Sequence, residues 1–489
     1  MNNRSAETKR AETAVLDRHP TRIRWWIMAL TTFTTAVTIF GRANLGILAR
    51  YVQDEFAFDT QTMGWIFSAF VLAYHPFQFL GGWAGDRYGP RKVMTFSILW
   101  WSVFTVAIAF EPRLPMNRLL GLAWSFAILR FLIGLGEAPT SPNLGKIVAL
   151  WMGKLHRGVG VSFHVLGIGL GGALAPVLVT WVGQHWGWRV GFCVPSVLGI
   201  LVAISWWYFA TDRPDQHPGV NADELAFFRS AVAQNVAAKG EEAGPRKRPP
   251  WGRMLSSVSV WAMLLSYFCQ GYTPYIFVTW FFIYLVRVRH LTMMQGGLWG
   301  STPFIAIMLL APIGGWLSDR AVAKFGKRRG RQSTVWLGMG SSAILLWAGG
   351  HALNNTTAIL MLAASSGLNY FAVPSWWATC IDITPTYSGS LIGMLQTAAG
   401  GWLAPIMTAY LATHFGWTEA LDFAALLTAL AAFLWIFVNA DENLEDIPVQ
   451  SKPRSMREVR MPTADGNTRS NKISDSGLTV SQEDDLWQK

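Results

Sequence analysis

The feature that most constrains this chain is an internal repeat. The dodecapeptide GGWAGDRYGPRK at 81–92 returns as GGWLSDRAVAKFGKRR from Gly314, which lies 233 residues after Gly81, and five of the first seven positions are identical. The same offset places the Gly-Leu pair at 134–135 on the pair at 367–368. Self-similarity over half of a chain indicates duplication. Duplicated apolar bundles are typical of secondary transporters, which bind their substrate between the two halves.

The composition predicts that these halves are helical and lie in a membrane. The 489 residues are 52% hydrophobic and only 14% charged, and apolar runs of about 20 residues recur that are long enough to cross a bilayer as helices. The 26 tryptophans fit aromatic belts at the two interfaces. We therefore predict an all-α polytopic membrane protein with twelve transmembrane helices. The expected spans are 24–48, 60–83, 93–111, 119–140, 158–182, 188–209, 256–285, 294–318, 333–351, 356–380, 389–413 and 418–439.

One long polar stretch divides the spans into six plus six. The predicted segments are an N-terminal segment at 1–22, pseudo-symmetric six-helix halves at 23–210 and 253–440, a linker at 211–252 and a tail at 441–489. The tail is polar and rich in Ser, Asp, Lys and Arg, so we expect it to be disordered.

The distribution of charge predicts the orientation. The net charge is +11, and the basic residues crowd the N-terminus, the turns at 87–92, 146–157 and 320–331, the linker and the tail, while the intervening loops carry few. This alternation places both termini in the cytoplasm of a multi-pass protein of the inner or plasma membrane. It indicates a lipid bilayer rather than nucleic acid as the partner, and we expect a monomer.

No motif indicates a cofactor or a metal. Cys193, Cys269 and Cys380 all fall in apolar segments without metal-ligand spacing, and they are expected to be small core residues. The first 22 residues contain no apolar run of the kind found in a cleavable signal peptide.

Several motifs resemble one transporter family. GGWAGDRYGPRK is similar to the loop between the second and third helices of the major facilitator superfamily. RANLGIL at 42–48, YHPFQFLGGW at 74–83 and GEAPTSPNLGKIVALW at 136–151 resemble its anion:cation symporter group, which includes bacterial sugar-acid and phthalate permeases and animal organic-anion carriers. The resemblance covers residues 23–440. It implies that Arg42, Tyr74, Arg130 and Glu137 occupy positions that match an organic-anion carrier. Bacterial sugar-acid symporters of this group carry an Asp before the first arginine, where this chain has Gly41.

Ionisable side chains inside spans are costly and are functional candidates by default. Arg130 and Glu137 are seven residues apart, so they lie on about the same face of one helix, about two turns from each other. One interpretation is that Glu137 neutralises Arg42 and Arg130 and locks two helices together. The other is that one or both arginines bind a substrate carboxylate with the planar guanidinium fork.

Glu137 is also the candidate for proton coupling. It lies among small residues in an apolar segment, where a low dielectric favours the protonated carboxyl, so it is suited to take up and release a proton. With Gly41 in place of an acid, it is the only acid placed firmly inside a span of the first half. His164 is a second candidate, and His75 and Asp382 are weaker ones.

The second half offers aromatic side chains rather than charges. At the 233-residue offset Arg42 corresponds to Tyr275, and Pro274 beside it can break the helix. Tyr275, Trp280, Trp377 and Gln396 are candidate contacts for the body of the ligand, although plain packing explains each of them equally well. A ligand with a carboxylate at one end and a ring or polyol at the other suits these two halves.

The repeated basic turn is expected to form a cytoplasmic gate. The resemblance implies that Asp86 pairs with charges at a neighbouring helix end and so biases alternating access. Arg87 and Arg91 belong to the same turn, and Asp319 and Arg320 are its weaker counterpart in the second half.

These observations favour a proton-coupled importer of a small organic anion, either a sugar acid or an aromatic carboxylate. An exporter or exchanger of similar anions is the alternative, because sequence does not determine direction. A polytopic membrane enzyme would need an acid or His cluster on a loop near the interface, and no loop carries one. A non-transporting sensor is disfavoured because the tail holds no recognisable signalling domain.

Overall fold

The computed structural model describes residues 21–226, 251–384, 387–445, 459–462 and 468–471, without the side chains of 153–159, 161–162, 459–462 and 468–471. The first half is built from long helices. They are α2 (Ile23–Phe56), α3 (Thr60–Tyr88), α4 (Pro90–Ala109), α5 (Pro115–Leu120), α6 (Leu122–Glu137), α7 (Thr140–Trp151), α8 (Gly153–Trp186) and α9 (Trp188–Tyr208), followed by the 3-10 turn η1 (Pro214–Gln216).

The second half contains more interrupted helices. Its elements are α11 (Trp251–Ser256), α12 (Val258–Thr279), α13 (Phe281–Ile283), η2 (Tyr284–Val288), α14 (Met293–Gly300), α15 (Thr302–Phe325), α16 (Lys327–Val335), η3 (Trp336–Gly340), α17 (Ser341–His351), α18 (Asn355–Ile383), α19 (Ser388–Thr397), η4 (Gly400–Trp402), α20 (Leu403–His414), α21 (Trp417–Leu434) and η5 (Trp435–Phe437). Each of the twelve predicted spans coincides with a helix or with consecutive helical pieces. The pieces arise where the chain bends, as between α12 and α13 and between α19 and α20.

Local sequence explains where the repeated turn interrupts the helices. Gly89 ends α3 with a φ of 88°, a left-handed conformation that disfavours any residue with a Cβ atom. Pro90 follows at the first position of α4, where its missing N–H has no helical partner and its fixed φ already suits a helix. In the first copy of the motif, the Gly-Pro pair therefore sets a sharp bend between two spans.

The outer faces of the helices are apolar. Trp26 is 66% exposed and Phe79 is 77% exposed, which is unfavourable in water but suits contact with lipid. Within the described residues, eight helices are by themselves long and apolar enough to cross a membrane. The prediction of a multi-pass membrane protein agrees with both observations.

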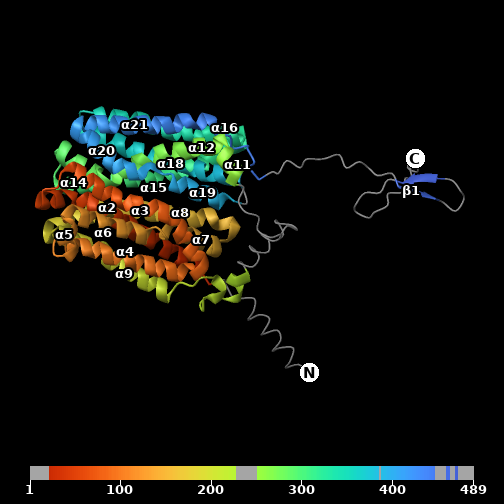
Figure 1. Cartoon of the computed structure of the whole chain (residues 1–489), viewed down its shortest axis with the longest axis horizontal. Helices are drawn as coiled ribbons and strands as arrows, with labels where there is room; N and C mark the ends of the chain where they lie inside the picture. The colour runs from red at the N-terminus through yellow and green to blue at the C-terminus, as the bar shows by residue number, and fades with distance from the viewer. Residues whose placement is uncertain (1–20, 227–250, 385–386, 446–458, 463–467, 472–489) are drawn as a thin grey trace, which may run out of the picture. The chain divides into compact units, whose positions relative to one another are not determined.

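The helices of the two halves group separately but pack on one another. Figure 1 shows the first-half helices, coloured red to yellow, on one side and the second-half helices, green to blue, on the other. Between them α3 packs against α20, α8 packs against α14 and α15, and α2 packs against α12 and α13. The described residues up to Glu445 accordingly form one compact unit. The boundaries predicted for the two halves remain a prediction.

Contacts between the halves gather toward one end of the bundle. We call this the far end; it carries the turns at 57–59 and 289–292, and the opposite linker end carries residues 21–23 and 211–226. Four described side-chain hydrogen bonds or ion pairs join the halves, and all lie between the far end and the level of His75. They are Asp54 with Arg287 (3.3 Å), Ser301 with the carbonyl of Ala173 (2.5 Å), Ser68 with the carbonyl of Trp402 (2.7 Å) and Tyr275 with His75 (3.3 Å).

The start of the linker is docked onto the first half. Glu224 is 1% exposed, and its carboxylate accepts hydrogen bonds from the Thr21 hydroxyl (2.8 Å) and from the backbone N–H groups of Ile23 (3.3 Å) and Arg24 (3.2 Å). Residues 227–250 of the linker, including the basic 245–250, lie outside the described residues.

The tail contains secondary structure that we did not predict. Strands β1 (Val459–Pro462) and β2 (Thr468–Asn471) pair antiparallel, with Val459 opposite Asn471. They belong to a second unit, Asp446–Lys489. Cross-strand hydrogen bonds satisfy the backbone polar groups of a segment that lacks enough apolar residues to form a core. The expectation of a disordered tail remains a prediction.

Candidate functional site

A buried ion pair joins two helices near the middle of the first half. Arg42 on α2 donates hydrogen bonds from Nε (3.0 Å) and from Nη2 to the same carboxylate oxygen of Glu137 on α6. The Glu137 side chain is 2% exposed and that of Arg42 is 13% exposed. A buried charge pair is tolerated only where hydrogen bonds compensate for lost solvation, so α2 and α6 are held in a defined register here.

Two aromatic rings of α3 support the guanidinium groups. Arg42 lies 4.3 Å from the ring centre of Tyr74 and 5.2 Å from that of Phe70, and the Arg130 guanidinium lies 4.9 Å from the same Phe70 ring. α3 approaches α6 this closely because Gly134 has no side chain; an added Cβ would lie 2.2 Å from the Phe70 carbonyl oxygen. Aromatic faces attract cations without neutralising them.

Arg130 differs from Arg42 in its partners. It is 3% exposed, and among the described residues its guanidinium has no hydrogen-bond acceptor, with Nε fully buried. Glu137 lies within electrostatic reach of Arg130, but the hydrogen bonds that its carboxylate accepts come from Arg42. The helical spacing correctly puts Arg130 and Glu137 on one face, yet the carboxylate pairs with the arginine of another helix. Arg130 therefore remains a buried donor group whose hydrogen bonds no described residue accepts.

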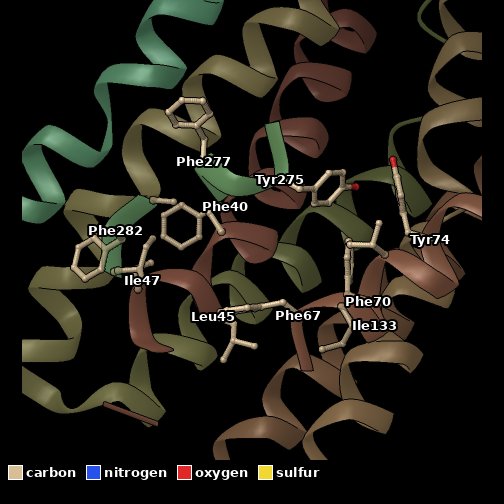
Figure 2. Packing of buried hydrophobic residues seen from close by; sticks show 14 of the residues in the cluster. Phe40, Leu45, Ile47, Phe67, Phe70, Tyr74, Ile133, Tyr275, Phe277 and Phe282 are labelled. Atoms are coloured by element: carbon tan, nitrogen blue, oxygen red, sulfur yellow. The ribbon is translucent and has the colours of Figure 1, made fainter. Parts of the chain in front are cut away.

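Hydrogen bonds fix the aromatic side of the site. The Tyr74 hydroxyl hydrogen-bonds the Ser141 hydroxyl at the start of α7 (2.9 Å), and the next residue, His75, hydrogen-bonds the Tyr275 hydroxyl of α12 (3.3 Å). Figure 2 shows Tyr275 extending toward Tyr74 and Phe70. Tyr275 of the second half therefore extends to the part of the first half that holds Arg42 and Arg130.

A second tyrosine of that half was missed by the sequence analysis. Tyr370 on α18 lies within electrostatic reach of both Arg42 and Tyr74. The 233-residue offset that relates Arg42 to Tyr275 also relates Glu137 to Tyr370. The signal was therefore present in the sequence, and the Arg42–Glu137 pair has a two-tyrosine counterpart in the other half.

The other candidates of the second half are placed differently. Trp280 is fully buried, donates to the Pro405 carbonyl (3.1 Å) and packs edge-on against Phe67, so its indole is used in packing between the halves. Trp377 on α18 is partly buried and lies beside Tyr267 of α12. Gln396 is partly exposed on α19, which packs against α3.

His164 has a local partner. Its Nδ1 lies 2.9 Å from the Thr35 hydroxyl of α2. This contact connects α8 to α2, the helix that carries Arg42.

The repeated turns contact residues of their own halves. Asp86 pairs with Lys146 of α7, while Arg87 lies over Trp83 and Tyr88 and Arg91 binds the Trp207 carbonyl from Nε (3.1 Å). In the second half Arg331 of α16 lies between two acids, Asp319 (3.0 Å) and Asp382 (3.3 Å), and Arg320 stacks over Trp316. Lys146 and Arg331 were not predicted, because nothing local distinguishes them from other basic residues of these turns.

Comparison with known proteins decides the family. Residues 31–402 match the model of the Major Facilitator Superfamily. The chain belongs to this superfamily. The resemblance expected from the motifs is thereby confirmed, together with the twelve-helix, two-half fold; the protein is a membrane transporter of the superfamily rather than an enzyme.

Curated relatives and solved structures agree with this assignment. The chain is 30% identical to a probable galactarate/D-glucarate transporter of Escherichia coli over 86% of this chain and 95% of that one. It is 27% identical to a probable sulfoacetate transporter of Cupriavidus necator over 86% and 94%. Its fold is similar to a D-xylose-proton symporter, with a TM-score of 0.63 at 17% identity over 85% of this chain and 98% of that one.

Within the described residues, no group of three or more His, Cys, Asp and Glu side chains is arranged to hold a metal ion.

Proposed function

We propose that this transporter imports a small organic anion, a sugar acid or an aromatic carboxylate, by proton symport through alternating access. The observation that carries the proposal is Arg130, a buried guanidinium without a hydrogen-bond acceptor among the described residues. A buried donor left unpaired is costly, and a carboxylate satisfies two of its N–H groups at once. The relatives named as transporters of galactarate, D-glucarate and sulfoacetate, all organic anions, support this ligand class.

The geometry supports a set of proposed ligand contacts. Arg130 is the carboxylate anchor, with Arg42 as its neighbour and Tyr74 as the supporting ring. Tyr275, together with Tyr370, faces the body of the ligand from the second half, and the indole of Trp377 and the amide of Gln396 are further candidate contacts. Trp280 is left out of the proposed site because its polar group already has a partner.

Glu137 is the proposed proton-coupling group. When it is ionised, it holds Arg42 in the buried pair. Protonation removes the charge that attracts Arg42, so both arginines become available to the anion and the α2–α6 connection weakens. Loss of the proton restores the pair and favours release of the anion. A proton and an anion are thereby bound together, which is the requirement for symport. His164 is the next candidate, because it hydrogen-bonds the helix that carries Arg42.

The repeated turns are the proposed gate. The Asp86–Lys146 and Asp319–Arg331 pairs connect helix ends within each half. We propose that Arg87, Arg91 and Arg320 hold these turns on their aromatic neighbours while the halves rock.

The proposed orientation puts both termini and the 211–252 linker in the cytoplasm of an inner or plasma membrane. Reporter fusions after residues 54, 230 and 460 test it. We expect 230 and 460 on the cytoplasmic side and 54 on the other. If residues 230 and 460 are found on opposite sides of the membrane, the prediction of six helices in each half is wrong.

Uptake into proteoliposomes tests the function directly. Purified protein is reconstituted, and entry of labelled sugar acids and aromatic carboxylates is followed with and without an inwardly directed proton gradient. We expect accumulation above equilibrium only with the gradient, and its loss on adding a protonophore. Accumulation independent of the gradient, or exchange without accumulation, would overturn proton symport. Absence of binding for every carboxylate would overturn the ligand class.

A further inference from the structure

The second copy of the repeated turn is longer than the first by one turn of helix. α3 and α15 both run away from the far end, and each ends at a glycine in the left-handed conformation, Gly89 (φ 88°) and Gly326 (φ 80°). One residue separates Arg87 from its glycine, whereas the five residues AVAKF separate Arg320 from its glycine. The additional residues lengthen α15 by about 6 Å.

This extension continues a row of exposed side chains along α15, which we call the α15 stripe. The stripe consists of Leu309, Ile313, Trp316, Arg320 and Lys324. At about 100° per residue these positions span an arc of about 80° on the helix, away from the buried face that packs against α18. Three apolar side chains, which suit contact with lipid, are therefore followed toward the linker end by two cations.

The level of each side chain along the stripe matches a layer of the bilayer. Trp316 is 54% exposed and lies near the end of the predicted span 294–318, where an aromatic ring is expected at the interface. Arg320 lies about 6 Å further along the helix axis and Lys324 about 12 Å further. Since the headgroup layer is about 5–8 Å thick on each side, Arg320 lies among the phosphates, and the flexible stem of Lys324 lets it reach them.

Aromatic rings hold both cations without neutralising them. The Arg320 guanidinium lies 3.9 Å from the ring centre of Trp316, and Nζ of Lys324 lies 5.2 Å from that of Phe325. Stacking of this kind positions a cation but leaves its N–H groups free to bind an anion.

The acids near this turn are already paired. Asp319 at the end of α15 and Asp382 of α18 both face Arg331. In the described part of the chain, no carboxylate lies within ion-pair distance of Arg320 or Lys324. The ammonium group of a zwitterionic headgroup therefore meets no free carboxylate here, whereas an anionic headgroup has the charge that the two cations attract.

The first copy of the turn offers less to an anion. Arg87 stacks over Trp83, at the repeat positions of the corresponding pair on α15, but α3 ends at the next residue. The following basic residue, Arg91, donates from its side chain to the Trp207 carbonyl (3.1 Å) and from its backbone N–H to the Asp212 carboxylate (2.8 Å). The exposed face of α3 therefore ends in one cation, where that of α15 ends in two.

We propose that the end of α15 binds an anionic phospholipid, with the headgroup phosphate between Arg320 and Lys324 and the acyl chains along the apolar part of the α15 stripe. A phosphodiester accepts charge-assisted hydrogen bonds from a guanidinium and an ammonium group. The apolar stripe distinguishes a lipid from a free phosphate ion, which has nothing to place there. This binding needs neither substrate nor proton, so it is independent of the proposed function.

Competition between two lipids tests the proposal. Purified full-length protein in detergent is saturated with a fluorescent phosphatidylglycerol. The label is then displaced by unlabelled phosphatidylglycerol or by phosphatidylcholine with the same acyl chains. We expect phosphatidylglycerol to displace it at a concentration at least about tenfold lower, because each basic side chain near an anionic headgroup contributes about fivefold in affinity.

Removing the two cations should abolish this preference. Arg320→Gln combined with Lys324→Gln is expected to weaken phosphatidylglycerol binding about thirtyfold, and Lys324→Gln alone about fivefold, while phosphatidylcholine is unaffected. Arg87→Gln combined with Lys92→Gln is the matched control, because it removes two charges from the first copy of the turn. The affinity for phosphatidylglycerol should stay unchanged in this control.

Three outcomes would overturn lipid binding at α15. Equal displacement by the two lipids would exclude a preference for the anionic headgroup. Equal losses in the two double variants would show a general effect of charge rather than a site on α15. Displacement by inorganic phosphate as readily as by phosphatidylglycerol would assign the cations to a free anion. The comparison of lipids on the unaltered chain needs no variant, so a misfolded variant leaves the test intact.

Discussion

At the scale of single residues, the two arginines differ in what already satisfies them. Arg42 has a carboxylate partner on another helix, whereas Arg130 has an aromatic face and no acceptor among the described residues. From helical spacing alone, both arginines were equal candidates for binding the substrate carboxylate. Their different surroundings support the proposed anchoring role of Arg130 and the proposed coupling role of the Arg42–Glu137 pair.

Replacing Arg130 by lysine should weaken substrate binding by about 1–3 kcal/mol. The charge remains, but the planar fork that binds a carboxylate through two N–H groups is lost. Calorimetry with the best substrate measures the change. Arg189→Lys is the control, because Arg189 pairs with Glu55 at the far end and has no part in the site. Unchanged affinity in a folded Arg130→Lys variant would reassign Arg130 to packing.

Replacing Glu137 by glutamine should separate exchange from accumulation. The amide imitates the protonated carboxyl, so the variant is expected to bind anion and exchange it across the membrane. It should fail to concentrate substrate when an inward proton gradient is imposed, because it carries no proton. Paired exchange and accumulation assays in proteoliposomes measure both activities. Retained accumulation would move coupling to His164 or another group; loss of exchange as well, in a folded variant, would make Glu137 a structural partner of Arg42.

At the scale of elements, the linker completes the first helix. α2 has no side-chain cap of its own and no acid in its first turn, so its first N–H groups need an acceptor from elsewhere. Glu224 supplies it from 200 residues further along the chain, and its negative charge also complements the helix dipole. The start of the linker is therefore part of the packed first half.

Glu224→Ala should lower the thermal stability of the purified protein. Loss of a helix cap costs about 0.5–2 kcal/mol, and we expect a value toward the upper end because Glu224 is buried and accepts three hydrogen bonds. The melting temperature of detergent-solubilised protein is the measurement. Asp223→Ala removes an exposed acid next to it and should change little. Equal effects of the two changes would argue against capping.

At the scale of the whole bundle, the halves meet through backbone contacts that need glycine. A Cβ on Gly46 of α2 would lie 2.4 Å from the Val278 carbonyl oxygen of α12, and one on Gly297 of α14 would lie 2.8 Å from the Pro176 carbonyl oxygen of α8. Both contacts cross between the halves. The close approach of the halves toward the far end therefore depends on glycines, which have no side chain at these contacts. The exposed Asp54–Arg287 ion pair also joins the halves there, but by itself it contributes little to stability.

Gly46→Ala should slow transport while preserving the fold and anion binding. The added methyl group disfavours the arrangement in which the halves meet at the far end, by about 1–3 kcal/mol for an overpacked contact. A shift of this size changes the population of a state roughly 5- to 150-fold, so we expect turnover to fall at least about fivefold. Initial uptake rates and equilibrium binding measure the two effects.

The control for this change is a glycine with free space around it. Gly145 on α7 has no atom within 4 Å of an added Cβ, so Gly145→Ala should leave turnover unchanged. Normal turnover in Gly46→Ala would show that the close contact does not limit the cycle.

The amino-acid sequence by itself determined the class of protein and the location of its spans. Hydropathy, basic turns and the 233-residue repeat are properties of local segments, and they predicted twelve helical spans and the superfamily. Buried charges stand out for the same reason, since Arg42, Arg130 and Glu137 are conspicuous in apolar runs. The offset would also have indicated Tyr370, had it been applied to Glu137.

Only the tertiary structure decided which of these groups meet. That Glu137 pairs with Arg42 rather than Arg130, that Lys146 is the partner of Asp86, and that Trp280 is used in packing all depend on how helices rotate against one another. These choices follow from close contacts such as that of Gly134 with the Phe70 carbonyl, which join residues far apart in the chain. Periodicity gives the face of a helix that is buried, but the partner of that face is set by packing between helices.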